Sequence, residues 1–390
     1  MDIKALAEEF SPYIIERRRY YHAHPELSFK EWETTKALIE DVKALGYEIQ
    51  SFEDYPGLVA TLDTGKPGRT VMLRADIDAL PVNEKTGLPF ASQNEGVMHA
   101  CGHDSHIAML LGAAKILMSV RDEIPAGKVK LIFQSGEEMG YGAKYYVEHG
   151  VLDGVDAIFG LHVWGTFDAP YLSVDSGNRM ASMDNFTIKV HGLQSHGSAP
   201  QDGKDAIVAA SAIVLALQTF VSRKNDPRNP LVISVGKFHG GAMYNIICPE
   251  VELVGTIRTY SRSLRSTLEA ELRRIVENAA QAYDCTAELE LSSMIPAVIN
   301  DNDELNEIAA SAAVRLYGPE GVRSMPSLMG SEDFALFTEK VPGFFGYVGS
   351  RNPEKGTIYT NHNEKYTVDE DALQRGSALA AQFAVDFLSK

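Results

Sequence analysis

Hydrophobic and charged positions alternate at helical spacing in the first fifty residues, over residues 3–10 and again over residues 31–45, with His24-Pro25 breaking the pattern between them. The pattern then changes to short β-branched and apolar runs, which are separated by helical stretches such as residues 107–120. The runs are GLVATLD, TVMLRAD, KVKLIFQ and DAIFGLHV. Strands of this kind that alternate with helices predict an α/β layer with a largely buried sheet.

The order of the predicted elements changes near the middle of the chain. A strand, FTIKVHG, is followed by a helix over residues 205–221, by two strands and by a second helix over residues 264–283. The strand TAELELSS completes the order β-α-β-β-α-β, which is the ferredoxin-like split pattern. The chain then returns to helix, strand and helix. We therefore expect a small domain, residues 185–297, inserted into an α/β domain made of residues 1–184 and 298–390.

The length of 390 residues and the hydrophobic fraction of 45% suit two domains with well-buried cores. The formal net charge is −17 and there is no basic tract. This argues against binding to nucleic acid or to an anionic membrane, since both need clustered Lys and Arg. The most apolar stretch, residues 206–221, is expected to be too short for a membrane span.

The N-terminus and the cysteines bear on the compartment. The first ten residues carry acids where a signal peptide has a basic segment, and they resemble the start of an amphipathic helix. Three cysteines cannot all pair with one another, and a chain of this length needs no disulfide framework. We therefore expect a soluble cytoplasmic protein.

Residue types that bind metal ions gather at predicted strand ends and helix starts. Cys101 and His103 lie in HACGHD, Glu137 and Glu138 end QSGEE, and His162 lies in GLHV. In open α/β sheets this edge is where ligands bind. Cysteine, histidine and carboxylate together are typical of zinc, although imidazole and carboxylate also bind manganese or cobalt. The pattern therefore favours a transition-metal site.

The two adjacent glutamates indicate a division of roles. Glu137 and Glu138 directly follow a predicted buried strand, where acids need a positive partner such as a metal ion. One glutamate would bind the ion while its neighbour acts as general base on a water. Two alternatives stay open, a cysteine hydrolase with Cys101 as nucleophile and a non-catalytic metal-binding scaffold.

Ten motifs follow one another over nearly the whole chain: YHAHPELSFKE, RADIDALPVNE, MHACGHDSH, FQSGEE, GLHVWG, SHGSAPQDGKDAI, YNIICPE, GTIRTY, MGSEDFALF and NHNEKY. In these motifs the chain resembles the dinuclear metallo-amidohydrolases, a family that includes aminoacylases and carboxypeptidases. Within it, the chain resembles the subgroup of hippurate hydrolases, N-acyl-L-amino acid amidohydrolases and indole-acetyl-amino acid hydrolases. The resemblance implies a large zinc-peptidase-like α/β catalytic domain with an inserted ferredoxin-like lid and dimerisation domain.

The resemblance also implies a role for each matching residue. Two divalent ions, zinc, manganese or cobalt, would be held by Cys101, His103, Glu138, His162 and His362. Glu137 would be the base that activates the water between the ions, and Asp78 would orient a ligand. In the inserted domain, His196 would stabilise the oxyanion, often in the partner subunit's site in such enzymes. Asn245 and Arg258 would bind the substrate carboxylate.

The chain departs from the family pattern at three places. Asp76 stands where many wider-family members have a metal-binding histidine, so the thiolate of Cys101 is expected to take that role. QSGEE stands where the subgroup usually has QPAEE, which removes a rigid proline and is expected to alter the stiffness of this loop. Cys248 intervenes before Pro249, where proline usually follows the isoleucines. No ligand is lost, so the expected effect is on acyl-group preference.

Several neighbouring residues are given ordinary structural roles. His22 and His24 of the N-terminal motif are expected to cap or pack, and His106 is expected to be structural. Glu332 and Asp333 in GSEDF are expected to cap a helix. None of these five residues is counted in the site.

The expected reaction is hydrolysis of the amide bond of an N-acyl-L-amino acid, of N-acetyl, N-benzoyl or indole-acetyl type, to an acid and a free amino acid. A dipeptidase, a carboxypeptidase or an N-acetyl-diaminopimelate deacetylase is an alternative, because fold and ligands do not set the substrate. By resemblance we expect a homodimer or homotetramer formed through the inserted domain, with no nucleic acid and no membrane as partner.

Overall fold

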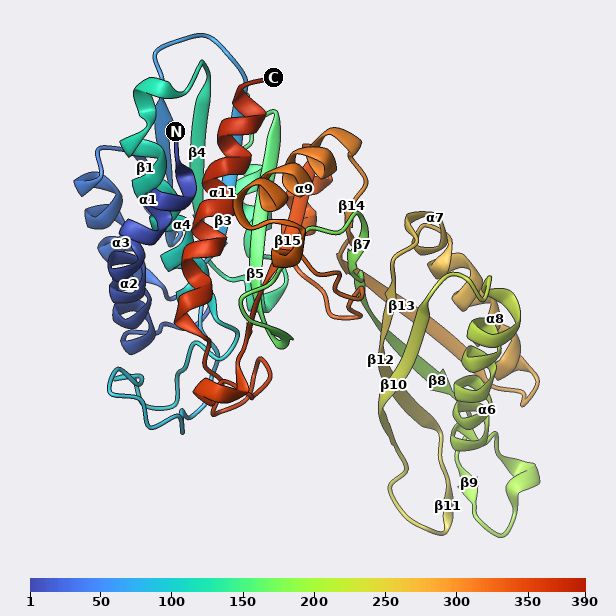
Figure 1. The fold of residues 1–390 in the computed structure, drawn as a ribbon. Helices are drawn as coiled ribbons and strands as arrows, with labels where there is room; N and C mark the ends of the chain where they lie inside the picture. The colour runs from blue at the N-terminus through green and yellow to red at the C-terminus, as the bar shows by residue number, and fades with distance from the viewer. The chain divides into compact units, whose positions relative to one another are not determined.

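The computed structural model describes residues 1–390, and the chain divides into two compact units. The large unit consists of Met1–Arg179, Ile299–Ser327 and Asp333–Lys390. The small unit consists of Met180–Val298 and Leu328–Glu332. Both termini therefore lie in the large unit, as Figure 1 shows.

A seven-stranded sheet forms the centre of the large unit, in the order β1-β2-β4-β3-β5-β15-β6. The inner strands β4, β3, β5 and β15 run parallel, while β1, β2 and β6 each pair antiparallel with a neighbour. The strands are Glu48–Ser51 (β1), Gly57–Asp63 (β2), Thr70–Asp76 (β3), Lys128–Gln134 (β4), Ala157–Asp168 (β5), Leu172–Ser173 (β6) and Gly343–Arg351 (β15). Every residue of β3 is buried, as in parallel strands covered on both faces. The predicted α/β class is confirmed.

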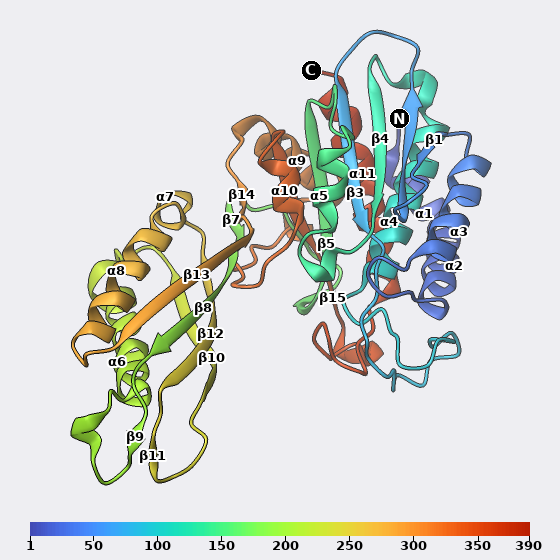
Figure 2. The ribbon, with the colours of Figure 1, turned by 180° about the vertical axis from the view of Figure 1, so that it is seen from behind.

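Helices cover both faces of this sheet (Figure 1 and Figure 2). Helices α4 and α11 pack on one face together with α1 and α2, and α5 and α10 lie on the opposite face. Both α4 and α11 are buried nearly all round, which is typical of helices enclosed between a sheet and other helices. The helices are Ile3–Glu9 (α1), Ser11–Ala23 (α2), Trp32–Ala44 (α3), His103–Ser119 (α4), Gly142–Glu148 (α5), Asp303–Tyr317 (α9), Phe334–Thr338 (α10) and Leu373–Leu388 (α11).

The small unit contains a four-stranded antiparallel sheet in the order β10-β12-β8-β13, with helices α6 and α8 on one face (Figure 1). Along the chain the order is strand, helix, two strands, helix, strand, which is the ferredoxin-like split order. The main elements are Met183–His191 (β8), Ala206–Thr219 (α6), Leu231–Gly240 (β10), Glu250–Thr259 (β12), Leu268–Gln281 (α8) and Thr286–Ile295 (β13). Shorter elements of this unit are Ser195–His196 (β9), Ile246–Ile247 (β11) and Arg262–Arg265 (α7). Gly177–Met180 (β7) and Val298–Asn300 (β14) pair with each other where the chain passes from one unit to the other.

Helix α6 continues through a π-helical turn, so that 19 helical residues run from Ala206 to Lys224. By length and hydropathy alone this helix is long enough to cross a membrane, because it continues three residues beyond the predicted stretch 206–221. One face of the helix is buried in the core of the small unit through Ala209, Ile213 and Leu217. Packing against the sheet therefore accounts for the apolar residues of this face, but not for those on the opposite face.

Candidate metal centre

Most of the residues that the sequence assigned to metal binding lie near the carboxyl ends of the parallel strands, and His162 lies within β5 itself. Strand β3 ends at Asp76, and β4 ends three residues before Glu137. The pairing of β3 with β5 stops two residues before His162. Cys101 and His103 lie at the start of α4. This is the edge at which open α/β sheets bind their ligands.

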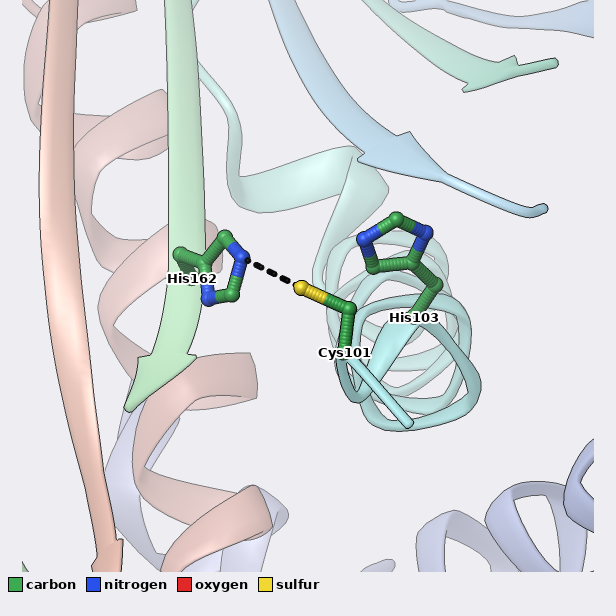
Figure 3. Close-up of side chains that lie close together, drawn as sticks. All are labelled: Cys101, His103 and His162. Carbon is green, nitrogen blue, oxygen red and sulfur yellow. Dashed lines mark hydrogen bonds between the residues drawn. The ribbon is translucent and has the colours of Figure 1, made fainter. Parts of the chain in front are cut away.

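Five groups of three side chains are close enough to hold a metal ion, and two of them share Cys101. In one group, the ligand atoms of Cys101, His103 and His162 lie within 4.8 Å of one another (Figure 3). In the other group, those of Cys101, Glu138 and His362 do so. Sγ of Cys101 lies 3.5 Å from Nε2 of His162, and Nε2 of His362 lies 3.4 Å from Oε1 of Glu138. The shared thiol therefore lies between two candidate ion positions.

The two buried histidines direct one ring nitrogen each at the centre. His103 donates through Nδ1 to Asp78 at 3.1 Å, and His162 donates through Nδ1 to the backbone oxygen of Val163 at 2.6 Å. Nε2 of His103 is buried without a hydrogen bond and lies 3.9 Å from Oε1 of Glu138. A buried nitrogen without a partner, beside a thiol and a carboxylate, fits a divalent ion.

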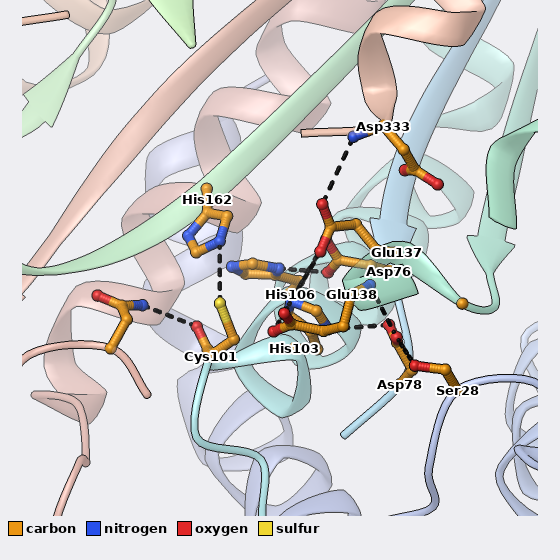
Figure 4. Close-up of polar contacts among 12 residues, drawn as sticks. Ser28, Asp76, Asp78, Cys101, His103, His106, Glu137, Glu138, His162 and Asp333 are labelled. Carbon is orange, nitrogen blue, oxygen red and sulfur yellow. Dashed lines mark hydrogen bonds and ion pairs between the residues drawn. The ribbon is translucent and has the colours of Figure 1, made fainter. Parts of the chain in front are cut away.

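Asp78 holds three parts of the site together (Figure 4). It accepts hydrogen bonds from Nδ1 of His103, from Oγ of Ser28 at 2.7 Å and from the backbone N–H of Glu138 at 3.0 Å. Burial by itself lowers the pKa of His103, but the carboxylates of Asp76 and Asp78 outweigh it and raise the pKa to about 10. The surroundings of His103 therefore favour a positive charge strongly, and either a proton or a metal ion supplies it.

Glu137 shares a short turn, Glu137–Met139, with Glu138 but has different neighbours. Its Oε2 lies 4.0 Å from Nε2 of His103, and its Oε1 accepts a long hydrogen bond of 3.4 Å from the backbone N–H of Asp333 (Figure 4). It is grouped with His103 and Glu138, whereas the group of Cys101 and His362 contains Glu138 and not Glu137. A carboxylate that lies beside the ligands without completing the second group is suited to act as a general base.

Asp76 is locked by two side chains. Arg74 donates through Nη1 to Oδ2 of Asp76 at 2.8 Å, and His106 donates through Nδ1 to Oδ1. The Nε2 of His106 accepts from the backbone N–H of Val163 at 2.9 Å, which places the ring proton on Nδ1. Burial raises the pKa of Asp76, but the charge of Arg74 and the neighbouring histidines hold it well below its usual range. Both oxygens of Asp76 are thus engaged.

Asp333 lies at the start of α10, but its side chain makes no capping hydrogen bond, contrary to the sequence expectation. Its carboxylate accepts instead from Nη2 of Arg74 at 3.0 Å, from Nε2 of Gln134 at 2.8 Å and from the backbone N–H of Ala143 at 2.8 Å. Because the backbone of Asp333 also contacts Glu137, this buried network adjoins the candidate base.

Comparison with known proteins places the chain in a family. Residues 72–386 match the model of peptidase family M20/M25/M40, which is more than half of the chain. The chain belongs to this family.

Two curated relatives of this M20 protein are similar over nearly their whole length. The chain is 40% identical to thermostable carboxypeptidase 1 of Saccharolobus solfataricus, a match that covers 100% of this chain and 98% of that protein. It is 39% identical to N-acetylcysteine deacetylase of Bacillus subtilis, covering 96% of this chain and 97% of that protein. A solved Bacillus subtilis structure, described as a dinuclear metal binding peptidase from the M20 family, has a TM-score of 0.88 at 35% identity, covering 98% and 99% of the two chains.

As a member of the M20 family, this chain is an enzyme that hydrolyses amide bonds. The family assignment, together with two groups of donors that share Cys101, supports two divalent ions in each chain. The donors are one sulfur, three imidazole nitrogens and one carboxylate, a set that several transition metals accept.

His362 is the ligand candidate that local sequence patterns did not indicate. It lies in the loop after β15 and has a φ of 69°, a backbone conformation that residues other than glycine rarely adopt. Its backbone N–H donates to the oxygen of Ala100 at 2.7 Å, beside Cys101. Such strained conformations concentrate at functional sites. The positive φ of His362 is a feature of the folded backbone, and the residue types of NHNEKY do not indicate it.

The three remaining predicted residues belong to the small unit. His196 is exposed on β9, and Asn245 immediately precedes β11, with which β9 pairs. The N–H of Gly197 donates to the backbone oxygen of Asn245 at 2.8 Å, so these two predicted residues lie together. Arg258 lies on β12, where its Nη1 donates to Oγ of Ser331 at 3.0 Å.

Proposed function

We propose that this chain is a metal-dependent amidohydrolase that releases an acid and a free amino acid from N-acyl-L-amino acids. The observation that carries the proposal is the pair of donor groups that share Cys101, with Glu137 beside them. The relative named N-acetylcysteine deacetylase supports an N-acyl amino acid as the substrate. Sulfur, nitrogen and oxygen donors suit zinc, and manganese or cobalt are the other candidates.

The proposed chemistry divides into binding and proton transfer. The five ligand residues would hold two divalent ions, which would polarise the scissile carbonyl and lower the pKa of the attacking water. Glu137 accepts the proton of this water and passes it to the leaving amine. Its side chain lies in a buried setting, where a carboxylate acts on a proton with little competition from bulk water. Asp78 holds Nδ1 of His103, which would leave Nε2 free to bind an ion.

The small unit supplies the remaining roles in the proposal. His196 stabilises the oxyanion, while Asn245 and Arg258 hold the substrate carboxylate by hydrogen bonds. Catalysis then requires the small unit to close on a metal centre, and residues 182–185 and 297–300 are the proposed hinges.

We also propose a homodimer or homotetramer through the small unit. The face of α6 turned away from its core exposes Ile207, Val208 and Leu215, and Leu215 is 71% exposed. An apolar face of this kind is typical of an interface. The three cysteines are buried and unpaired, which is consistent with the proposed cytoplasmic location.

Two other functions would use parts of the same site. A carboxypeptidase is supported by the relative named thermostable carboxypeptidase 1, and it would take a peptide in place of an N-acyl amino acid. A cysteine hydrolase is disfavoured, because burial first and then the nearby carboxylates of Glu138 and Glu137 raise the pKa of the Cys101 thiol well above its usual value. A nucleophilic cysteine needs the opposite shift.

The test is hydrolysis of N-acetyl-, N-benzoyl- and indole-acetyl-amino acids and of dipeptides by metal-stripped protein and by protein reloaded with zinc, manganese or cobalt. The proposal predicts that activity on at least one N-acyl amino acid vanishes on stripping and returns with metal. Cleavage of dipeptides alone would favour the carboxypeptidase. Activity that is indifferent to metal but lost on thiol alkylation would favour Cys101 as a nucleophile.

A further inference from the structure

The N-terminal motif YHAHPELSFKE has no role in the function described so far, yet its second half reaches the centre of the site. Ser28 Oγ donates to Oδ2 of Asp78 at 2.7 Å, and Asp78 in turn holds His103 and the backbone of Glu138. Residues 28–31, called here the N-terminal clamp, lie between α2 and α3. The clamp and all of its partners described here belong to the large unit.

Glu31 bonds the two residues that directly precede the candidate base. One oxygen of its carboxyl group accepts from Oγ of Ser135 at 2.7 Å, and the other accepts from the backbone N–H of Gly136 at 2.9 Å. Both Glu31 and Ser135 are fully buried. The backbone N–H of Ser135 donates in addition to the hydroxyl of Tyr146 at 3.0 Å. The turn before Glu137 is therefore fixed from two sides.

The ring of Phe29 packs against the same turn. Gly136 has a φ of 73°, and a Cβ atom added to it would lie 2.2 Å from the ring of Phe29. Phe29 itself has a φ of 65°, a conformation that is costly for a residue with a side chain. Strain of this kind persists only where the surroundings hold it, and here it brings an aromatic ring against the turn that carries Glu137.

We propose that Glu31 is a positioning residue, which fixes the Ser135-Gly136 turn and thereby the carboxylate of Glu137 relative to the ion ligands. This inference rests on the proposed function, in which Glu137 is the base. The proposed ligand Glu138 is fixed by a further interaction, because its backbone N–H donates a hydrogen bond to Asp78. Loss of the Glu31 contact should therefore disturb Glu137 more than it disturbs metal binding.

The experiment compares Glu31→Ala, Glu31→Gln and Ser135→Ala in the metal-loaded enzyme. The amide side chain in Glu31→Gln would keep an acceptor for Gly136 and place a donor at Ser135. Glu31→Ala removes both contacts, whereas Ser135→Ala removes one. Steady-state kinetics, metal content and hydrogen exchange of the segment 134–140 are measured for each variant.

Tyr47→Leu is the matched control. Tyr47 is a buried residue of the large unit whose hydroxyl donates to the backbone oxygen of Ala114 in the second half of α4, at 2.9 Å. This substitution removes a buried side chain and its hydrogen bond, but no partner of the segment 134–140. It therefore reports the effect of lost stability alone.

We expect Glu31→Ala to lower kcat by about 10- to 100-fold, the loss typical of a misplaced catalytic group, with KM and metal content nearly unchanged. Ser135→Ala should lower kcat less than Glu31→Ala does, and Glu31→Gln should keep most of the wild-type kcat. Exchange in the segment 134–140 should rise in Glu31→Ala, with or without metal, and stay unchanged in Tyr47→Leu.

Two results would overturn the assignment. One is a loss of kcat in Tyr47→Leu as large as that in Glu31→Ala, which would show a general effect of lost stability. The other is unchanged exchange of the segment 134–140 in Glu31→Ala. If the wild-type enzyme cleaves no amide with any metal, the proposed function fails, while the exchange measurement still decides the role of Glu31 in holding the turn.

Discussion

Replacing Arg74 by methionine tests the charge balance of the network beneath the site. The Arg74 side chain is 1% exposed and donates to Gln134 at 2.8 Å, to Asp76 at 2.8 Å and to Asp333 at 3.0 Å. Methionine has a similar length and no charge, so Arg74→Met removes the cation with little change in packing volume. Asp333 keeps donors from Gln134 and Ala143, whereas Asp76 keeps only His106 among these partners.

The expected decrease in the free energy of unfolding follows from removing one partner of a buried ion pair. Such a change costs about 3–5 kcal/mol, because the remaining charge is left buried and uncompensated. With an unfolding entropy of about 2.1 cal/mol/K per residue, 1 kcal/mol corresponds to roughly 2 °C for a unit of this size, so the melting temperature of the large unit should fall by about 5–10 °C. The measurement is calorimetry of metal-free protein, so that any change in metal affinity does not contribute.

The pH dependence of the free energy of unfolding distinguishes the loss of the Arg74 charge from a loss of packing. In the wild type the pKa of Asp76 is held below its ordinary value, so its contribution to stability is present above about pH 4 and is lost only as the pH falls through the folded pKa. In Arg74→Met, burial acts without Arg74 and raises the pKa of Asp76, and protonation then relieves the penalty. The stability difference from the wild type should be largest near neutral pH and should shrink on acidification.

As a control, Arg74→Lys keeps the positive charge but not the several N–H donors of the guanidinium group. Near neutral pH it should lower the free energy of unfolding less than Arg74→Met does. Two results would contradict the reasoning: a decrease in the free energy of unfolding of Arg74→Met that is the same at about pH 8 and at about pH 5, or one below about 1 kcal/mol. Either would show that the charge of Arg74 does not stabilise the buried carboxylates.

Two further changes test the ligand support and the interface. Asp78→Asn should lower metal affinity by about 10- to 100-fold, because His103 loses the carboxylate that orients it, and competition with a chelator measures this; unchanged affinity would refute the role of Asp78. Leu215→Glu should convert the proposed dimer to a monomer with its full metal content, as measured by light scattering; a persistent dimer would place the interface away from α6.

Much of the metal centre could be predicted from local sequence because the α/β pattern determines where strands end. Cys101, His103, Glu138 and His162 all lie at or beyond predicted strand ends or at a helix start, and such positions meet at one edge of the sheet. His362 lies in an irregular loop near the end of the chain, where no periodicity applies. Its assignment as a ligand came from the resemblance, and the structure brings it to 3.4 Å from Glu138.

The interactions that support the ligands could not be predicted, because each depends on two residues far apart in the chain. Arg74 and Asp333 form an ion pair, although nothing near either residue indicates the other. The expectation of a helix cap at Asp333 was reasonable for an acid before an apolar run, but its carboxylate turns inward to Arg74, Gln134 and Ala143 instead. Buried acids of this kind need a donor, and only the folded chain shows which one is present.

The change from QPAEE to QSGEE shows how such a pairing alters the meaning of a departure. The sequence predicts an altered stiffness of this loop, since serine lacks the ring of proline. In the structure the hydroxyl of Ser135 is bonded to the buried carboxyl group of Glu31, and the next residue, Gly136, is bonded to its other oxygen. Proline has neither a hydroxyl group nor a backbone N–H. Here hydrogen bonds therefore restrain the turn before Glu137 where a ring would otherwise do so, and the departure need not loosen the base.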